Sequence, residues 1–370
     1  MNPTRLGRLP ILPVVTMLAS LLVPTSPPAD AARDSVTCYR VALDYRPQWI
    51  SAALGDSFQV IVVNSWGEDG HRLLSYSPRG KVTVLPAIEG YRDSEFFPAK
   101  IARIGGSGFL LQLADGTTLR LDERLQASDH GLAPQERAGG LRLGSMYQFT
   151  IVGDAAVAYG ALLTSPESIE LGVFRAPLRS TAAERLTMLQ PFSDSDFYLT
   201  GYPYLATIGD EAYFVRMSKQ PAIYRVGATG REVEKLAAFP QEYMVRPDFK
   251  TRMTGPKTAP PHFAELETFT VPAGLYAQGG MLFLLGRTPD PPRGTAWWLY
   301  EIDPRSDRIV GRVRLPTSAS HLTLAPSESA WYLFERSSVG ENQRQEIATM
   351  VVLPSSAVTA LSLPASCPMR

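Results

Sequence analysis

One pattern of residues recurs along most of the chain and limits the folds open to it. Each copy has a short apolar strand, a tight turn of small or acidic residues, and a second, strongly apolar strand. The turns begin at residues 55, 105, 153, 209, 279 and 326, at intervals of 50, 48, 56, 70 and 47 residues. Gly-Asp and Gly-Gly pairs at these turns are typical of hairpins, because glycine adopts positive φ at little cost. A repeat of about 50 residues is typical of one blade of a β-propeller.

The rest of each unit supplies two further strands. In the fifth unit they cover residues 296–303 and 309–315, where the second strand alternates between faces, as expected for a half-buried outer strand. In the last unit we expect them at 347–353 and 358–363. We therefore predict an all-β fold, a six-bladed β-propeller with four-stranded antiparallel blades. A pair of antiparallel sandwiches is the competing fold. Helical signal is confined to a turn or two over 181–189.

The two cysteines lie near opposite ends of the chain, Cys38 close to the start and Cys367 close to the end. In an oxidising compartment we expect them to form a disulfide, which would bring the termini together as a closed ring requires. Two unpaired thiols are the alternative. Residues 39–43 are expected to join the last blade as a ring-closing strand.

The first 32 residues have the features of a secretory signal peptide. Arg5 and Arg8 precede an apolar stretch over residues 9–23, and small residues follow at 29–31. A membrane anchor is the alternative, although a spanning helix needs about 20 apolar residues. We expect cleavage to leave one propeller domain over 33–370, secreted or periplasmic in a bacterium, with no membrane span.

Charge and composition exclude two classes of protein. The chain has 36 basic and 36 acidic residues, whereas a nucleic-acid-binding protein needs a basic surface. It is 45% hydrophobic, which is enough apolar side chain to form a large core and exclude a disordered polyelectrolyte.

The strand rhythm, together with the phrase Leu299-Tyr300-Glu301-Ile302-Asp303-Pro304, gives the chain a resemblance to known proteins. Most of residues 39–363 resembles the secreted six-bladed propellers, in the broad sense of the NHL and TolB-like groups. The resemblance implies the fold, and it carries no functional residue to this chain.

Motifs of common enzyme classes are missing from the sequence. We find no Gly-x-Ser-x-Gly elbow, His-Glu-x-x-His pair, P-loop, EF-hand loop or dinucleotide fingerprint. The four histidines are isolated in sequence and are expected on the surface or in loops. No catalytic residue is assigned.

Two segments between units are candidate sites. The 70-residue interval contains an insert at about 240–273, in which Tyr243, Lys250, Arg252 and His262 could grip an anionic or sugar-like ligand. The alternative is a mobile or edge-covering loop. Asp194 and Asp196 could share a Ca²⁺ ion, or they could simply solvate a connecting loop. A third segment, 120–140, is expected to be an irregular polar loop.

A repeat scaffold without a catalytic constellation favours a non-catalytic module that binds a small ligand or an envelope or extracellular protein. The alternative is a propeller enzyme, of metal-assisted hydrolase or lactonase type, with its site at the channel mouth. A structural part of a cell-envelope assembly is a third option. Apart from Ca²⁺, no cofactor is expected.

Overall fold

The computed structural model describes most of the predicted strands. The described residues are 38–43, 52–54, 60–67, 70–85, 98–104, 108–113, 118–132, 142–165, 168–177, 184–191, 204–216, 222–227, 233–241, 270–290, 294–339 and 344–370. Chain contacts separate residues 1–35 from residues 36–370, and all described residues belong to the second unit. The predicted signal peptide over 1–32 lies outside them.

Within the described residues, the strands form six antiparallel sheets of four strands each, which we number along the chain. Sheet 1 contains β2 (Ala52–Leu54), β3 (Val60–Gly67), β4 (Gly70–Tyr76) and β5 (Val82–Val84). Sheet 2 contains β6 (Pro98–Ile104), β7 (Gly108–Leu113), β8 (Thr118–Leu121) and β9 (Ala127–Leu132). Sheet 3 contains β10 (Arg142–Val152), β11 (Ala155–Ser165), β12 (Ser168–Pro177) and β13 (Glu184–Pro191).

The other three sheets follow the same plan, except that the last takes one strand from the start of the chain. Sheet 4 contains β14 (Tyr204–Ile208), β15 (Glu211–Arg216), β16 (Ala222–Val226) and β17 (Val233–Lys235). Sheet 5 contains β18 (Val271–Gln278), β19 (Met281–Asp290), β20 (Gly294–Asp303) and β21 (Arg308–Arg314). Sheet 6 contains β22 (His321–Pro326), β23 (Ala330–Val339), β24 (Arg344–Pro354) and, outermost, β1 (Tyr39–Ala42), and the short helix α3 (Ser355–Thr359) follows it.

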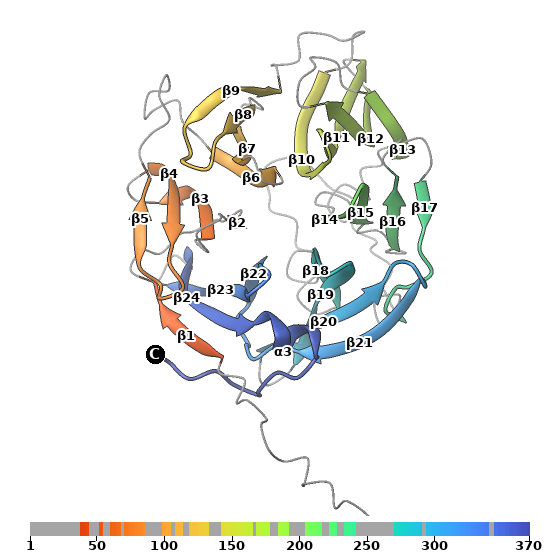
Figure 1. Cartoon of the computed structure of the whole chain (residues 1–370). Helices are drawn as coiled ribbons and strands as arrows, with labels where there is room; N and C mark the ends of the chain where they lie inside the picture. The colour runs from red at the N-terminus through yellow and green to blue at the C-terminus, as the bar shows by residue number, and fades with distance from the viewer. Residues whose placement is uncertain are drawn as a thin grey trace, which may run out of the picture. The chain divides into compact units, whose positions relative to one another are not determined.

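The sheets of this unit are arranged around an axis (Figure 1). The inner strands β2, β6, β10, β14, β18 and β22 contact one another in that order, and β22 in turn contacts β2. Each pair of neighbouring sheets also encloses its own cluster of buried apolar side chains. This closed arrangement confirms the all-β propeller class and excludes two separate sandwiches.

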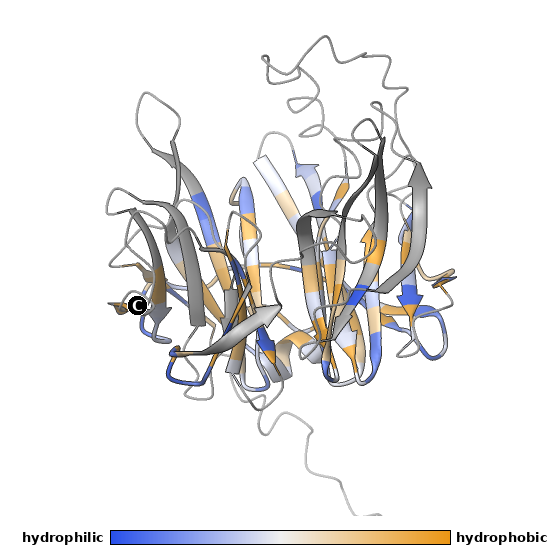
Figure 2. Cartoon of the chain, turned by 90° about the horizontal axis from the view of Figure 1, so that it is seen from above, coloured by the Kyte–Doolittle hydropathy of each residue, from blue (hydrophilic) through white to orange (hydrophobic). Residues whose placement is uncertain are grey.

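The apolar residues concentrate along the strands, with hydrophilic residues toward the turns (Figure 2). Every residue of β7 is buried, because a second strand has a sheet on each side. Between sheets 5 and 6, Trp331 packs edge-to-face on Phe283 with ring centroids 5.1 Å apart. Burial of such large side chains stabilises each by about 1.5–3 kcal/mol relative to exposure.

The hairpin turns predicted at residues 153, 209 and 279 are present. Gly153 and Gly209 both have φ of +57°, and Gly279 has φ of +59°. These values belong to the left-handed region, where a side chain would add strain, so glycine is the favoured residue.

Both termini of the described unit meet on sheet 6. Strand β1 pairs antiparallel with β24, as predicted for residues 39–43. The C-terminal tail runs along the other edge of β1, where the Arg40 N–H donates to the Pro368 carbonyl at 2.8 Å. The predicted Cys38–Cys367 disulfide is present, with both cysteines buried.

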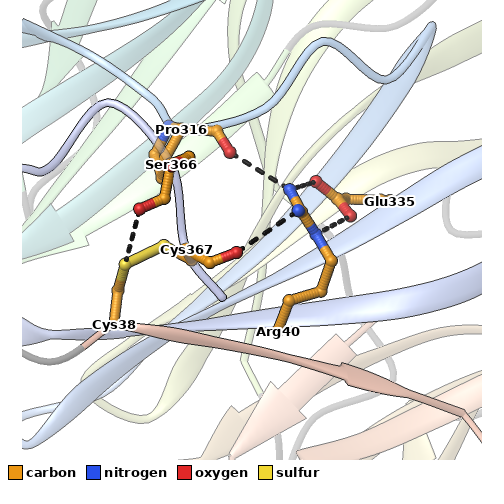
Figure 3. The surroundings of a disulfide bond; sticks show 6 residues. All are labelled: Cys38, Arg40, Pro316, Glu335, Ser366 and Cys367. Atoms are coloured by element: carbon orange, nitrogen blue, oxygen red, sulfur yellow. Dashed lines mark hydrogen bonds and ion pairs between the residues drawn. A yellow bond between two sulfur atoms is a disulfide. The ribbon is translucent and has the colours of Figure 1, made fainter. Parts of the chain in front are cut away.

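An ion pair reinforces this closure (Figure 3). The Arg40 guanidinium donates two hydrogen bonds of 2.8 Å to the Glu335 carboxylate on β23. It also donates to the carbonyls of Pro316 and Cys367, and Thr349 donates to Glu335 at 2.6 Å. Arg40 therefore joins the N-terminal strand, the tail and the body of sheet 6.

Four predicted segments differ from the structure. Residues 184–191 form strand β13, not a helical turn, because pairing with β12 overrides their helix propensity. Residues 127–132 within the expected loop 120–140 form β9. The expected outer strand at 358–363 is instead the end of α3 and the tail, since β1 already occupies the outer edge. The predicted insert ends before residue 271, where β18 begins.

No helix within the described part of the chain is long and apolar enough to cross a membrane.

Candidate functional site

Polar side chains gather where the inner strands begin, which we call the starting end of the ring. Lys100, Tyr204 and His321 each lie five residues before the turn of their own repeat, so they occupy equivalent positions on β6, β14 and β22. Repeats related by rotation about the axis place equivalent residues at the same end of the ring. Loops and strand ends at one end of a propeller are the usual place for a site.

The starting end carries a group of four residues from sheets 4, 5 and 6, which we call the basic cluster: Tyr204, Arg287, His321 and Arg336. His321 and Arg336 are directly opposite one another on β22 and β23, so their side chains share one face of sheet 6. Alternation with their buried neighbours turns that face toward sheet 1. All four side chains are half-buried.

Electrostatics link the members of the cluster. The pKa of His321 is lowered to about 4, first by burial and then by the charges of Arg336 and Arg287. Its imidazole is therefore neutral at pH 7. Burial also lowers the pKa of Arg336.

Arg287 connects sheet 5 to its neighbours on both sides. It lies on β19 opposite Val271, close to the start of β18. Burial raises the pKa of Tyr204 to about 12, while the charge of Arg287 acts to lower it. Arg287 therefore influences the pKa of one residue on each neighbouring sheet, Tyr204 on sheet 4 and His321 on sheet 6.

Two threonine hydroxyls contact each other near the start of sheet 5. The Oγ1 atoms of Thr270 and Thr288 are 3.4 Å apart, immediately before β18 and immediately after Arg287. Deeper in the same sheet, the Tyr276 hydroxyl accepts the Leu324 N–H at 3.4 Å, and burial raises its pKa.

Lys100 is the residue of sheet 2 that lies at the starting end. Its Nζ lies 5.2 Å from the centroid of the Phe149 ring on the neighbouring inner strand. Burial lowers its pKa to about 7, so a substantial fraction is uncharged at neutral pH. It pairs in register with the buried Gln112.

The residues predicted as ligand or metal site lie outside the described residues: Tyr243, Lys250, Arg252, His262, Asp194 and Asp196. Pro191 and Tyr204 border the segment that contains Asp194 and Asp196. Gln241 and Thr270 border the predicted insert. Tyr204 and Thr270, the first described residues after these segments, lie at the start of the inner strands β14 and β18. The roles proposed for the predicted ligand and metal residues stay predictions.

No sequence motif marks the basic cluster, because its members come from three repeats. Of the four histidines, His71 and His130 lie on β4 and β9, His321 begins β22, and His262 lies outside the described residues. Aligning the repeats on their turns would have paired His321 with Tyr204 and Lys100. Recognising Arg287 and Arg336 as members of the cluster requires the pairing register of the strands.

In the described ranges, no group of three or more His, Cys, Asp and Glu residues is placed to hold a metal ion. A groove of about 370 Å³ lies on the outer side of sheet 5, where Phe239, Tyr300, Ile309 and Val310 line it. Gln241 and Arg312 also line it, and none of its lining residues belongs to the basic cluster.

No protein-family model matches the sequence, and no curated protein matches it. Similar solved structures include a subtype N11 neuraminidase-like protein of A/flat-faced bat/Peru/033/2010 (H18N11), 10% identical, with a TM-score of 0.46 over 88% of this chain and 90% of that chain. Kuenenia stuttgartiensis hydrazine synthase is 12% identical, with a TM-score of 0.45 over 87% and 82% of the two chains.

A structure from a study of two prolyl endopeptidases is 13% identical, with a TM-score of 0.40 over 82% of this chain. The match spans 42% of that longer chain, less than half its length. The neuraminidase-like protein and hydrazine synthase are β-propeller proteins, and the likeness concerns the fold alone. The finer resemblance to the NHL and TolB-like groups stays a prediction.

Proposed function

We propose that this chain is an exported six-bladed propeller, of broadly NHL or TolB-like type, that binds a small ligand without chemically changing it. The observation that carries the proposal is the basic cluster, in which the charge of Arg287 on sheet 5 acts on Tyr204 of sheet 4 and on His321 of sheet 6. Charged and hydrogen-bonding groups held by rigid strands are typical of a ligand site.

Export is supported by the signal-like N-terminus and the buried disulfide, which is typical of oxidising compartments. The test is the intact mass of the protein recovered from the periplasm or medium of a bacterial host. A mass that corresponds to loss of residues 1–32 supports export, and full-length protein retained in the cytoplasm contradicts it.

Ligand binding is tested with a panel of neutral sugars, sugar acids, sugar phosphates, amino acids and dicarboxylates, scored by thermal shift and calorimetry. We expect at least one compound to bind saturably to the wild-type protein and at least tenfold more weakly to a Tyr204→Ala/His321→Ala double variant. Arg305→Ala is the matched control, because Arg305 is exposed in the β20–β21 turn, away from the cluster.

Absence of binding by the whole panel, or binding that the double variant leaves unchanged, contradicts the proposal. Conversion of a bound compound into product would instead support the enzyme alternative.

A further inference from the structure

The outer edge of sheet 5 carries an exposed pair of apolar side chains. Strand β21 is the last strand in the order of this sheet, on the outside of the ring, and no described strand pairs with its outer edge (Figure 1). Four large apolar side chains are exposed in the described part of the chain, and two of them, Ile309 and Val310, are adjacent on β21. Val310 is the extra residue of a β-bulge, since Ile309 and Gly311 pair with consecutive residues of β20. Bulges at sheet edges commonly re-aim a side chain.

Ile309 and Val310 line the groove on the outer side of sheet 5, together with the buried side chains of Phe239 and Tyr300. We call it the edge groove. Because the consecutive residues 309–312 line it, the groove follows β21. A segment that fills it must therefore be extended along the strand.

The edge groove is held in shape by the turn that precedes β21. The Asp307 carboxylate accepts the backbone N–H groups of Ala237 at 2.7 Å and of Ala238 at 2.9 Å. These hydrogen bonds tie the turn of sheet 5 to the segment that leads to Phe239. The groove is therefore formed before a partner binds, which lowers the ordering cost of binding.

Positive charge accompanies the groove. Arginine occupies four positions in β21 and in the turn before it: Arg305, Arg308, Arg312 and Arg314. Arg312 lines the groove and lies over the Trp298 ring, 4.9 Å from its centroid. Arg308 is exposed and forms no ion pair with another described residue.

The carboxylates close to β21 in the sequence or in the sheet are used within the fold. Asp303 accepts hydrogen bonds inside its own turn, and Asp307 accepts the two N–H groups of the neighbouring segment. Asp290 pairs with Arg314 at 2.6 Å. Excess positive charge beside an apolar groove favours a partner that has both acidic and apolar side chains.

A second copy of this chain fits the edge poorly. Two identical edge strands related by a twofold axis would bring their arginines together, and like charges opposite one another destabilise strand pairing. Charged residues and bulges are common protection against such pairing of identical edges. The edge therefore favours a partner of opposite charge.

We propose that the edge groove binds an extended acidic segment of another protein. An apolar side chain of that segment packs against Val310 and Tyr300, and its carboxylates lie beside Arg308 and Arg312. This surface is separate from the basic cluster, so the proposal does not depend on the small-ligand function.

The test is selection of random peptides displayed on phage against the wild-type protein, followed by fluorescence anisotropy with the enriched peptides. We expect the enriched peptides to combine Asp or Glu with apolar residues. Their binding should weaken as salt increases, because part of the attraction is between exposed charges.

Val310→Asp should weaken binding of the enriched peptides at least tenfold, and Arg308→Glu at least threefold at low salt. Val84→Asp is the matched control for the first variant, since Val84 is 51% exposed on the outer strand of sheet 1 and Val310 is 52% exposed. Arg79→Glu, at an exposed residue of the β4–β5 turn, is the control for the second. Both control proteins should bind like the wild type, and circular dichroism checks that all four are folded.

Peptides that enrich equally on wild-type and Val310→Asp protein would overturn the proposal, as would enriched peptides without acidic residues. Failure of any peptide to enrich on the wild-type protein would do the same. Sedimentation of the free protein tests the remaining occupant. A dimer that Val310→Asp converts to a monomer would assign the groove to a second copy and also overturn the proposal.

Discussion

Two glycines with positive φ illustrate how individual positions depend on their surroundings. Gly108, the first residue of β7, has φ of +112°, and a Cβ at this position would lie 2.0 Å from the Leu121 carbonyl oxygen. Gly209 has φ of +57° in an exposed turn, where a Cβ would meet no atom within 4 Å. Gly108 is restricted both by its backbone conformation and by the neighbouring backbone of Leu121. Gly209 is restricted by its backbone conformation alone.

We therefore expect Gly108→Ala to lower the free energy of unfolding by about 3 kcal/mol or more, through backbone strain and displacement of β8. The matched variant Gly209→Ala should cost only about 1–2 kcal/mol, the ordinary penalty for a left-handed residue with a side chain. Urea unfolding of both variants measures the difference. Equal costs would show that the close approach to Leu121 does not restrict this position.

Because Lys100 is buried, we predict that the free energy of unfolding depends on pH. Burial lowers the pKa of Lys100 in the folded protein to about 7, from an ordinary value of 10.5. Between these pH values the unfolded chain binds a proton that the folded protein has released, so stability rises with increasing pH across this window. At pH 7 and below, this gain in the free energy of unfolding is lost.

The variant Lys100→Met should show a smaller rise in the urea midpoint than the wild-type protein between pH 7 and pH 10. Lys235→Met, at an exposed residue of β17, is the control and should keep the wild-type slope. Identical slopes for wild type and Lys100→Met would mean that burial does not perturb this lysine.

At the scale of elements, β1 is held to sheet 6 by more than its backbone pairing. Arg40 binds Glu335 with two hydrogen bonds, and the Glu335 side chain is only 10% exposed. Removal of one partner of a buried pair leaves the other charge uncompensated, whereas replacement of both by apolar residues is often tolerated.

We expect Arg40→Met to cost about 3 kcal/mol, the lower part of the range for a buried pair, because Arg40 is partly exposed. The double variant Arg40→Met/Glu335→Met should recover most of that loss. Arg175→Met, which removes an exposed pair with Asp154, should cost less than about 1 kcal/mol. A double variant as unstable as Arg40→Met alone would assign the loss to packing and not to charge.

The elements differ in how far the sequence predicts them. Hairpins such as the one at Gly209 were predictable, because glycine and alternating apolar residues act locally. Strand β13 was not, since Glu184, Leu186 and Met188 favour a helix and only pairing with β12 makes them a strand. Likewise, α3 replaced an expected strand because the N-terminal β1 occupies that edge. The basic cluster could not be predicted, because register across three repeats assembles it.

For the whole molecule, closure of the ring depends on contacts between the two ends of the chain. The disulfide joins residues 329 positions apart, so it restricts nearly the whole unfolded chain. Among the described strands, the inner ones form the complete circle, and sheet 6 alone contains strands from both ends of the sequence. Separation of β1 from the rest of sheet 6 therefore opens the ring and leaves the other sheets intact.

The double variant Cys38→Ser/Cys367→Ser should lower the free energy of unfolding by about 2–5 kcal/mol, because the unfolded chain regains the entropy that the crosslink removes. Hydrogen exchange of the folded variant should accelerate first in β1 and β24, since the outer strand then has no covalent link to the tail and is held by backbone pairing, the Arg40 ion pair and apolar packing alone. Wild-type protein treated with a reductant is the control for the serine side chains and should exchange in the same order. An unchanged free energy of unfolding, or hydrogen exchange that accelerates first in another sheet, would show that closure of the ring does not depend on the disulfide.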